Sequence, residues 1–341
     1  MDPNTGEVLA LIGGNNYSKS QFNRATKAKR QVGSTMKPLL YYSALESGFT
    51  SSSSFTSEKT TFTFSGGKSY SPKNYNDRYA EGPLSMEAAI AYSDNIYAVK
   101  THLFLGESNL INTAKRLGIT SNLSEVPSLA LGTSEISLIE MTSAYSCFAS
   151  LGYKTTPHFI KKIEDSKGNI LYENKEEKEL LLNPSLTYIL NEMLTSTYNK
   201  NFINYNYPTL ISLLPQITHK YAIKSGTTDT DLLIMGYNKN VVLGVWNGYD
   251  NNTKIDSSEY SHHKNIWIDT MESYFKQKEA SWYEIPNNVV GVLTEPITGA
   301  LATDETQNKE MFFYLKGTEP SAESNYKDLE AVFQEENNSN T

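Results

Sequence analysis

Serine and lysine recur in short motifs whose spacing could support acyl transfer. The first is Ser34-Thr-Met-Lys37, at the start of a predicted helix. Residues at i and i+3 share one helix face, with Cβ atoms roughly 5–6 Å apart. A lysine whose pKa is lowered by burial or by a neighbouring cation can take the serine proton, and N–H groups at the helix start can stabilise an oxyanion. Alone the motif is weak, because S-x-x-K occurs five times and most copies are expected to be surface residues.

The second motif is Ser93-Asp94-Asn95, the only S-x-N in the chain. Apolar residues at helical spacing precede and follow it, so the sequence predicts a corner between two helices. Taken alone, the motif favours an ordinary helix–loop–helix turn.

The third motif is Lys224-Ser225-Gly226, followed by Thr227, on a predicted strand. A lysine flanked by hydroxyl groups can bind a carboxylate, and a glycine lets a ligand backbone approach closely. Alone it could be an ordinary edge strand. Together the three motifs are far more specific, because 59 residues separate Ser34 from Ser93 and 131 separate Ser93 from Lys224. Motifs of this type are the signature of penicillin-binding proteins and class A β-lactamases.

The elements that must position these motifs fall into three regions. The apolar run 7–12, closed by two glycines, predicts a buried strand, and a helix after Ser34 is expected to stop at Gly48. Helical spacing dominates residues 85–198, interrupted by a predicted hairpin near 159–172. Strands are expected later in the chain, over 221–227, 232–237, 241–249 and, as an edge strand, 289–293.

Strands at both ends with helices between them predict an α/β (α+β) fold, in which an antiparallel sheet is built from both termini and a helical subdomain is inserted. We expect one domain over residues 1–316. Its sheet subdomain comprises about 1–50 and 215–316, and its mainly helical subdomain about 51–214. The tail 317–341 carries six acidic residues against one lysine, so we expect it to be disordered.

Composition excludes several other functions. The chain has 341 residues and a net charge of −8 without a basic stripe, which argues against nucleic acid and anionic membrane surfaces as main partners. The single cysteine, Cys147, lies in an apolar run and is expected to be buried and unreactive. None of the five histidines has metal-ligand spacing, and the pair His262-His263 is expected at the surface. We predict no metal and no cofactor, and no run is long enough to span a membrane.

Beyond the motifs, several segments resemble the transpeptidase domain of class A penicillin-binding proteins. These segments are Arg30-Gln-Val-Gly-Ser-Thr-Met-Lys-Pro38, Tyr70-Ser-Pro-Lys-Asn-Tyr75, Ala130-Leu-Gly-Thr-Ser134, Gly244-Val-Trp-Asn-Gly-Tyr249 and Gly317-Thr-Glu-Pro320. The resemblance covers about residues 1–320 and implies the fold that these proteins share with serine β-lactamases. The chain opens on a turn and a strand, so we expect the C-terminal part of a longer protein. The glycosyltransferase domain and membrane anchor of the family would precede it.

The resemblance also implies roles for the motif residues. Ser34 would form an acyl-enzyme, with Lys37 as its general base. Ser93 would relay a proton to the leaving D-alanine, and Asn95 would hold the amide of the donor peptide. The third motif would bind the terminal carboxylate of the donor through Lys224, Ser225 and Thr227, and N–H groups of Ser34 and Thr227 would form the oxyanion hole.

The implied function is a serine D,D-transpeptidase that cross-links peptidoglycan stem peptides and is trapped by β-lactams. The implied location is the extracytoplasmic face of the bacterial membrane, reached only through the missing N-terminal part. The chain departs from the family at Ser225, where threonine is common, at Leu233, where an aromatic residue is common, and in a short stretch after the third motif.

Three alternatives stay open at this point. A β-lactamase would need a second base, and the best match, Glu107 in Glu107-Ser-Asn-Leu110, has the wrong spacing and follows Ser93 too soon. A DD-carboxypeptidase shares all three motifs, since water can replace the acceptor amine. A β-lactam sensor or a degenerate scaffold would be a binding protein without peptide turnover.

Overall fold

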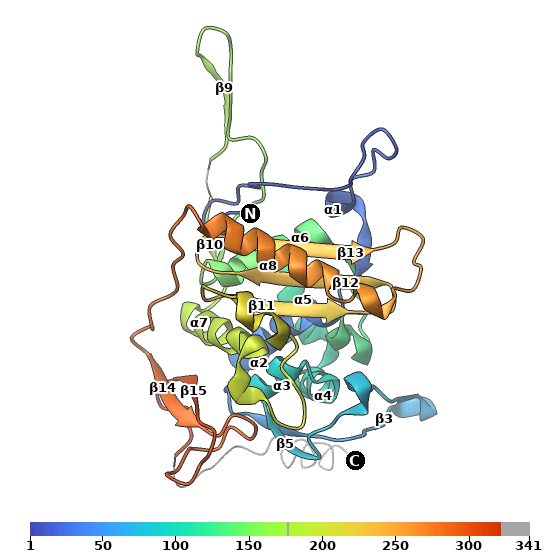
Figure 1. The fold of residues 1–341 in the computed structure, drawn as a ribbon, viewed down its shortest axis with the longest axis vertical. Helices are drawn as coiled ribbons and strands as arrows, with labels where there is room; N and C mark the ends of the chain where they lie inside the picture. Colours follow the sequence, from blue (N-terminus) through green and yellow to red (C-terminus); the bar gives the residue numbers. More distant parts are fainter. Residues whose placement is uncertain (176, 322–341) are drawn as a thin grey trace.

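The computed structural model describes residues 1–175 and 177–321. Its central sheet has three antiparallel strands in the order β11 (Ala222–Thr227), β12 (Asp231–Tyr237) and β13 (Val242–Gly248). Helix α8 (His262–Phe275) lies across one face of this sheet, and α6 (Leu138–Ala149) packs on the other (Figure 1).

Two successive residues of β12 explain how a helix packs on each face of the sheet, because neighbouring side chains of a strand point to opposite faces. At Gly236, a Cβ would lie 2.7 Å from Cε2 of Trp267 on α8 and closer still to Cζ2, so only glycine lets that helix approach. At Tyr237, the ring packs edge-on against Tyr145 of α6, with 6.1 Å between ring centroids. The indole N–H of Trp267 also donates to the carbonyl of Leu243, 3.1 Å away.

Most of the remaining helices lie beyond the β11 edge of the sheet, below it in this view (Figure 1). The α-helices outside the sheet layer are α1 (Arg24–Lys27), α2 (Lys37–Glu46), α3 (Met86–Tyr92), α4 (Asn95–Leu105), α5 (Glu107–Arg116) and α7 (Pro184–Met193). The two-stranded pairs are β1 (Lys29–Gln31) with β6 (Glu135–Ser137), β2 (Ser54–Ser57) with β5 (Gly82–Ser85), β3 (Phe62–Thr63) with β4 (Ser69–Tyr70), β7 (Tyr153–Lys154) with β10 (Glu179–Leu180), β8 (Lys162–Glu164) with β9 (Ile170–Glu173), and β14 (Val289–Thr294) with β15 (Glu310–Leu315).

Helix α2 is the buried axis of the domain, because every residue in it except Glu46 is buried. It ends at Glu46, and the predicted stop, Gly48, lies just beyond with a φ of +93°, a conformation that glycine adopts without a Cβ penalty. The N–H of Gly48 donates to Leu45 and the N–H of Phe49 to Ala44, which satisfies the last carbonyls of the helix.

The core contains many tyrosines, and several of their hydroxyls donate to backbone carbonyls. The hydroxyl of Tyr97 donates to the Ser53 carbonyl at 2.6 Å, and that of Tyr145 donates to the Thr35 carbonyl at 2.7 Å. Tyrosine therefore supplies many of the largest buried side chains in this core.

Two predicted strands differ from the structure. The run 7–12 makes only an isolated bridge from Glu7 to His158, and Ile12 is 86% exposed. An apolar run becomes a buried strand only beside a free strand edge. At the outer edge of β13, it is Met1 that exchanges two backbone hydrogen bonds with Val242, and the run 7–12 does not pair there. The predicted edge strand 289–293 instead pairs with β15, and this hairpin packs on α7, where Phe313 meets Tyr188.

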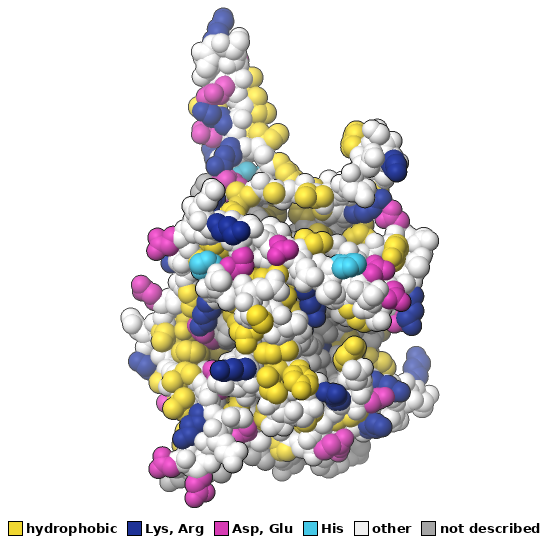
Figure 2. Space-filling view, in the orientation of Figure 1, with side chains coloured by type: hydrophobic (Ala, Val, Ile, Leu, Met, Phe, Trp, Pro, Cys, Tyr) yellow, Lys and Arg dark blue, Asp and Glu magenta, His cyan; other side chains and the backbone are white. Residues whose placement is uncertain are grey.

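The predicted hairpin near 159–172 is present as β8 and β9 and projects from the body of the molecule (Figure 2). The histidine pair was predicted at the surface, but only His262 is exposed. His263 is fully buried on α8, and burial lowers its pKa to about 3. The boundaries of the two subdomains stay a prediction. Most of the predicted acidic tail, residues 322–341, lies outside the described residues.

Candidate active site

Ser34 lies in the 3-10 turn η1 (Gly33–Met36), which leads directly into α2. The turn is anchored from below by the segment 130–134, since the N–H of Gly33 donates to the carbonyl of Gly132 at 3.1 Å. A Cβ at Gly132 would lie 2.6 Å from the Gly33 nitrogen and closer still to its carbonyl oxygen. Within the part of the chain that the structure describes, the Ser34 hydroxyl makes no hydrogen bond, so it is available to a substrate.

Lys37, the first residue of α2, is completely buried beside the α3–α4 corner. Its Nζ donates to the backbone carbonyls of Ser93 (2.6 Å) and Asp94 (3.1 Å) and to Oδ1 of Asn95 (2.7 Å), and it lies 3.2 Å from the Ser93 hydroxyl. Desolvation lowers the pKa of Lys37 to about 7, against the opposing effect of the Asp94 carboxylate. A lysine poised near neutrality can act as a general base.

Ser93 caps the C-terminal end of α3 in a left-handed conformation, with φ 56° and ψ 43°. This conformation is unusual for a residue other than glycine. It ends α3 and allows α4 to begin two residues later at Asn95. The Ser93 hydroxyl thereby lies between two lysine ammonium groups, 3.2 Å from Lys37 and 3.0 Å from Lys224.

Lys224 reaches the same point from the sheet, because β11 runs beside the α3–α4 corner. It is fully buried, and its Nζ also bonds the carbonyl of Ser225 at 2.7 Å. Desolvation lowers its pKa well below the usual lysine value, and the charges of Lys37 and Lys264 add to this effect. Ser225 is buried, and Thr227 is exposed at the end of the strand.

Gly226 has a different role from the one that the sequence suggested. The prediction gave this glycine a close approach to a ligand backbone. A Cβ at Gly226 would instead lie 2.5 Å from the carbonyl of Val32 and 3.1 Å from the nitrogen of Thr35. The glycine therefore allows β11 to pack against the chain's own η1 turn, which brings the third motif beside Ser34.

Asn95 is oriented by a loop that sequence reasoning did not treat as part of the site. Its Nδ2 donates to the carbonyl of Lys73 at 2.7 Å, which leaves Oδ1 facing Lys37. The adjacent Asn74 accepts the N–H of Asn95 at 2.7 Å through Oδ1. Both loop residues belong to the segment 70–75 noted for its family resemblance, but no local pattern indicated these contacts.

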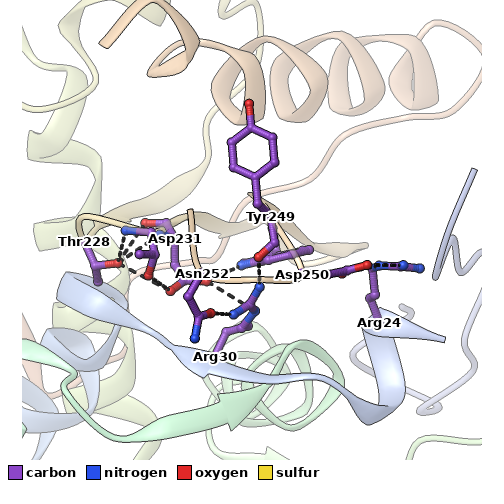
Figure 3. Close-up of polar contacts among 9 residues, drawn as sticks. Arg24, Arg30, Thr228, Asp231, Tyr249, Asp250 and Asn252 are labelled. Atoms are coloured by element: carbon purple, nitrogen blue, oxygen red, sulfur yellow. Dashed lines mark hydrogen bonds and ion pairs between the residues drawn. The ribbon is translucent and has the colours of Figure 1, made fainter. Parts of the chain in front are cut away.

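A second polar cluster holds the far end of β11 (Figure 3). Asp231, at the start of β12, accepts the indole N–H of Trp246 at 2.8 Å and lies 3.5 Å from the guanidinium of Arg30. Its backbone N–H and carbonyl both bond Thr228. Arg30 also donates to the Tyr249 carbonyl and to Asn252. This cluster ties the turn after the third motif to the strand that leads into η1.

The residues expected to be inert have surroundings consistent with that role. Cys147 is buried, and burial raises the pKa of its thiol to about 12. Glu107, the candidate second base, starts α5, and no hydrogen bond joins it to Ser34 or Lys37 among the described residues. Residues 1–175 and 177–321 contain no group of three His, Cys, Asp or Glu side chains that could hold a metal ion. No helix in these ranges is long and apolar enough to cross a membrane.

The mixed α/β fold, in which the three motifs converge around the Ser93 hydroxyl, is the fold of penicillin-binding protein transpeptidase domains. Residues 1–255 match the family model for the penicillin binding protein transpeptidase domain, and the chain belongs to this family. The family, the fold class and the transpeptidase class expected from the sequence are thereby confirmed.

Individual relatives agree with this assignment. The chain is 44% identical to penicillin-binding protein 2D of Bacillus subtilis over 323 residues, covering 94% of this chain and 47% of the relative. Penicillin-binding protein 1A from Haemophilus influenzae superimposes with a TM-score of 0.84 at 26% identity, over 94% of this chain and 53% of that one. PonA1 of Mycobacterium tuberculosis, solved with penicillin V, shares the fold with a TM-score of 0.67 at 22% identity, over 84% and 78%. The chain spans about half the length of the curated relatives it matches.

Proposed function

We propose that this chain is a serine D,D-transpeptidase that cross-links peptidoglycan stem peptides through an acyl-enzyme on Ser34. The observation that carries the proposal is the position of the Ser93 hydroxyl between two buried lysines, Lys37 and Lys224. Family membership and the unbonded hydroxyl of Ser34 support it.

Acylation begins with the neutral amine of Lys37. This amine removes the Ser34 proton while Ser34 Oγ attacks the carbonyl of the penultimate D-alanine. Because Lys37 Nζ now bonds to residues 93–95, a small side-chain rotation must first bring the two groups together, as catalytic contacts often tighten only with substrate. The N–H groups of Ser34 and Thr227 stabilise the tetrahedral oxyanion.

The tetrahedral intermediate collapses when its C–N bond breaks. The proton taken by Lys37 passes through the Ser93 hydroxyl to the departing amine of the terminal D-alanine. The ester on Ser34 is then attacked by an amine of a neighbouring stem peptide, whose lost proton follows the same route back. Ser34 regains its proton, and an amide cross-link is released.

The donor peptide is recognised on the Lys224 side of the Ser93 hydroxyl, away from Lys37. The terminal carboxylate of the donor binds Lys224 together with the hydroxyls of Ser225 and Thr227, and Asn95 holds the donor amide. The low pKa of buried Lys224 rises again when a carboxylate arrives, because an opposite charge favours the ammonium form. Gly226 contributes by keeping β11 close to η1.

β-Lactams are the second class of ligand in this proposal. The penicillin V complex of PonA1 supports this expectation for the shared fold. Opening of the lactam ring on Ser34 keeps the leaving group attached, which hinders attack by the acceptor. Because its proposed substrates are peptidoglycan stem peptides, its proposed location is the extracytoplasmic face of a bacterial membrane.

Intact-mass spectrometry with penicillin, followed over time, tests the proposal, with Ser34→Ala as the control. We expect a stable adduct on the native chain and none on the variant. Labelling that survives in the variant would refute the role of Ser34. Rapid loss of the adduct would indicate a β-lactamase. A stem-peptide donor with and without an added amine then separates cross-linking from carboxypeptidase activity, and a sensor would show neither.

A further inference from the structure

A buried carboxylate lies directly behind the Ser93–Asn95 corner. Asp94 is 3% exposed, and its Oδ1 accepts the N–H of Tyr97 at 2.8 Å, which caps the start of α4. Its Oδ2 accepts the hydroxyl of Ser57 at 2.5 Å and the amide Nδ2 of Asn74 at 2.6 Å. Three segments that are distant in the chain therefore meet at this one side chain.

Asn74 completes the cluster by bonding the backbone of the corner itself. While its Nδ2 holds Asp94, its Oδ1 accepts the N–H groups of Asn95 at 2.7 Å and Ile96 at 3.4 Å. These are unsatisfied donors of the first turn of α4. These hydrogen bonds fix the backbone of residues 94–97, directly after the left-handed Ser93.

The same corner supplies the acceptors of Lys37. Two of them are the backbone carbonyls of Ser93 and Asp94, and a third is the side chain of Asn95. The carbonyl of Asp94 accepts a hydrogen bond from Lys37 Nζ at 3.1 Å, and the charge of the Asp94 carboxylate raises the pKa of Lys37 against the effect of burial. A substitution at Asp94 would therefore affect Lys37 in two ways, by moving its hydrogen-bond acceptors and by changing the charge near it.

We propose that Asp94, held by Ser57 and Asn74, is a positioning residue that fixes the Ser93–Asn95 corner and supplies a negative charge near Lys37. This inference rests on the proposed function for its consequence in catalysis, but its electrostatic part concerns Lys37 alone. Asp94 touches no substrate in this scheme. It acts through the lysine and the hydroxyl that do.

Asp94 is the acidic group whose charge acts on the buried Lys37 at this corner. Lys37 comes from α2 and Lys224 from β11, and Lys264 of α8 adds positive charge near Lys224. Tyr41 and Tyr97 also face Asp94, and burial raises the pKa of both phenols well above the usual value, so they stay neutral. Tyr79 and Tyr205 face the same carboxylate, and their pKa values are raised as well.

The test compares Asp94→Asn with Ser57→Ala. The first variant keeps the shape of the side chain but removes its charge, whereas the second removes one hydrogen bond to the carboxylate and keeps the charge. Each protein is labelled with ε-¹³C-lysine, and the resonance of Lys37 is identified by its absence in Lys37→Arg. Its titration is followed by NMR, alongside the pH profile of penicillin acylation.

We expect Asp94→Asn to move the Lys37 titration and the acid limb of acylation to lower pH by about one unit, the usual effect of losing a nearby opposite charge. Ser57→Ala should lower the unfolding midpoint and leave the titration within a few tenths of a unit. A purely structural role would reduce acylation at every pH without moving the limb, and an unmoved Lys37 titration in Asp94→Asn would overturn the proposal.

A second variant protects the test against misfolding. The exchange Asn74→Asp with Asp94→Asn keeps one carboxylate and one amide facing each other, so the titration of Lys37 should return toward the native value. A titration displaced by a full unit in a folded double variant would contradict the proposal. Absence of a Ser34-dependent penicillin adduct on the native chain would refute the proposed function instead, while the Lys37 titration would still decide the role of Asp94.

Discussion

The packing of Gly132 beneath the Ser34 turn gives a sharp test of how the site is held. Gly132 has a φ of +73°, and a Cβ there would lie 2.6 Å from the nitrogen of Gly33. The substitution Gly132→Ala therefore adds two costs. The left-handed backbone costs about 1–2 kcal/mol for a residue with a Cβ, and the overlap costs about 1–3 kcal/mol more, as overpacking in a dense core does.

A matched control isolates the second cost. Gly48 has a similar positive φ of +93°, but a Cβ there would meet nothing within 4 Å. Gly48→Ala should therefore lose only about 1–2 kcal/mol of unfolding free energy, with no change in acylation. Gly132→Ala should lose about 2–5 kcal/mol in total and also slow acylation roughly 100-fold, because a displacement of about 1 Å at a reacting group costs that much.

Urea unfolding and the rate of labelling by a fluorescent penicillin measure the two effects separately. The comparison with Gly48→Ala removes the backbone term that both variants share. Equal stability losses and equal labelling rates in the two variants would refute the argument that the segment 130–134 positions Ser34. Recovery of labelling at lower temperature would show only that the variant is unstable.

Three further predictions concern individual side chains. Lys37→Arg should abolish penicillin acylation by intact mass although the charge is kept, because a guanidinium is never neutral in a protein; an active variant would contradict the base role. The pKa of Lys37, lowered to about 7, means that neutral amine accumulates as pH rises, so the acylation rate should increase through pH 7, and a rate independent of pH between 6 and 8 would argue against it. Burial and a raised thiol pKa should keep Cys147 from reacting with iodoacetamide until urea unfolds the chain. Fast alkylation of the native chain would show that Cys147 on α6 is accessible to the reagent.

Much of the fold could be predicted because the signals were local. The stop of α2 at Gly48 and the hairpin of β8 and β9 depend on residues close together in the chain. The predicted strand over residues 7–12 was wrong for the opposite reason. Its apolar pattern was real, but a strand needs a partner edge, and no local pattern states whether one is free. The 289–293 strand was present, yet its partner was β15 and not the central sheet.

The sequence by itself determined the chemistry available to this protein: a serine and a lysine at helical spacing, a serine and an asparagine at a corner, and a lysine on a strand, in an order typical of one family. Only the tertiary structure decided how these groups behave. It buried Lys37 and Lys224 around the Ser93 hydroxyl and packed Gly226 against the η1 turn. It also placed Asp94 and Asn74 behind the Ser93–Asn95 corner. The reason is physical, because a lysine becomes a base only when residues distant in the chain exclude water from it.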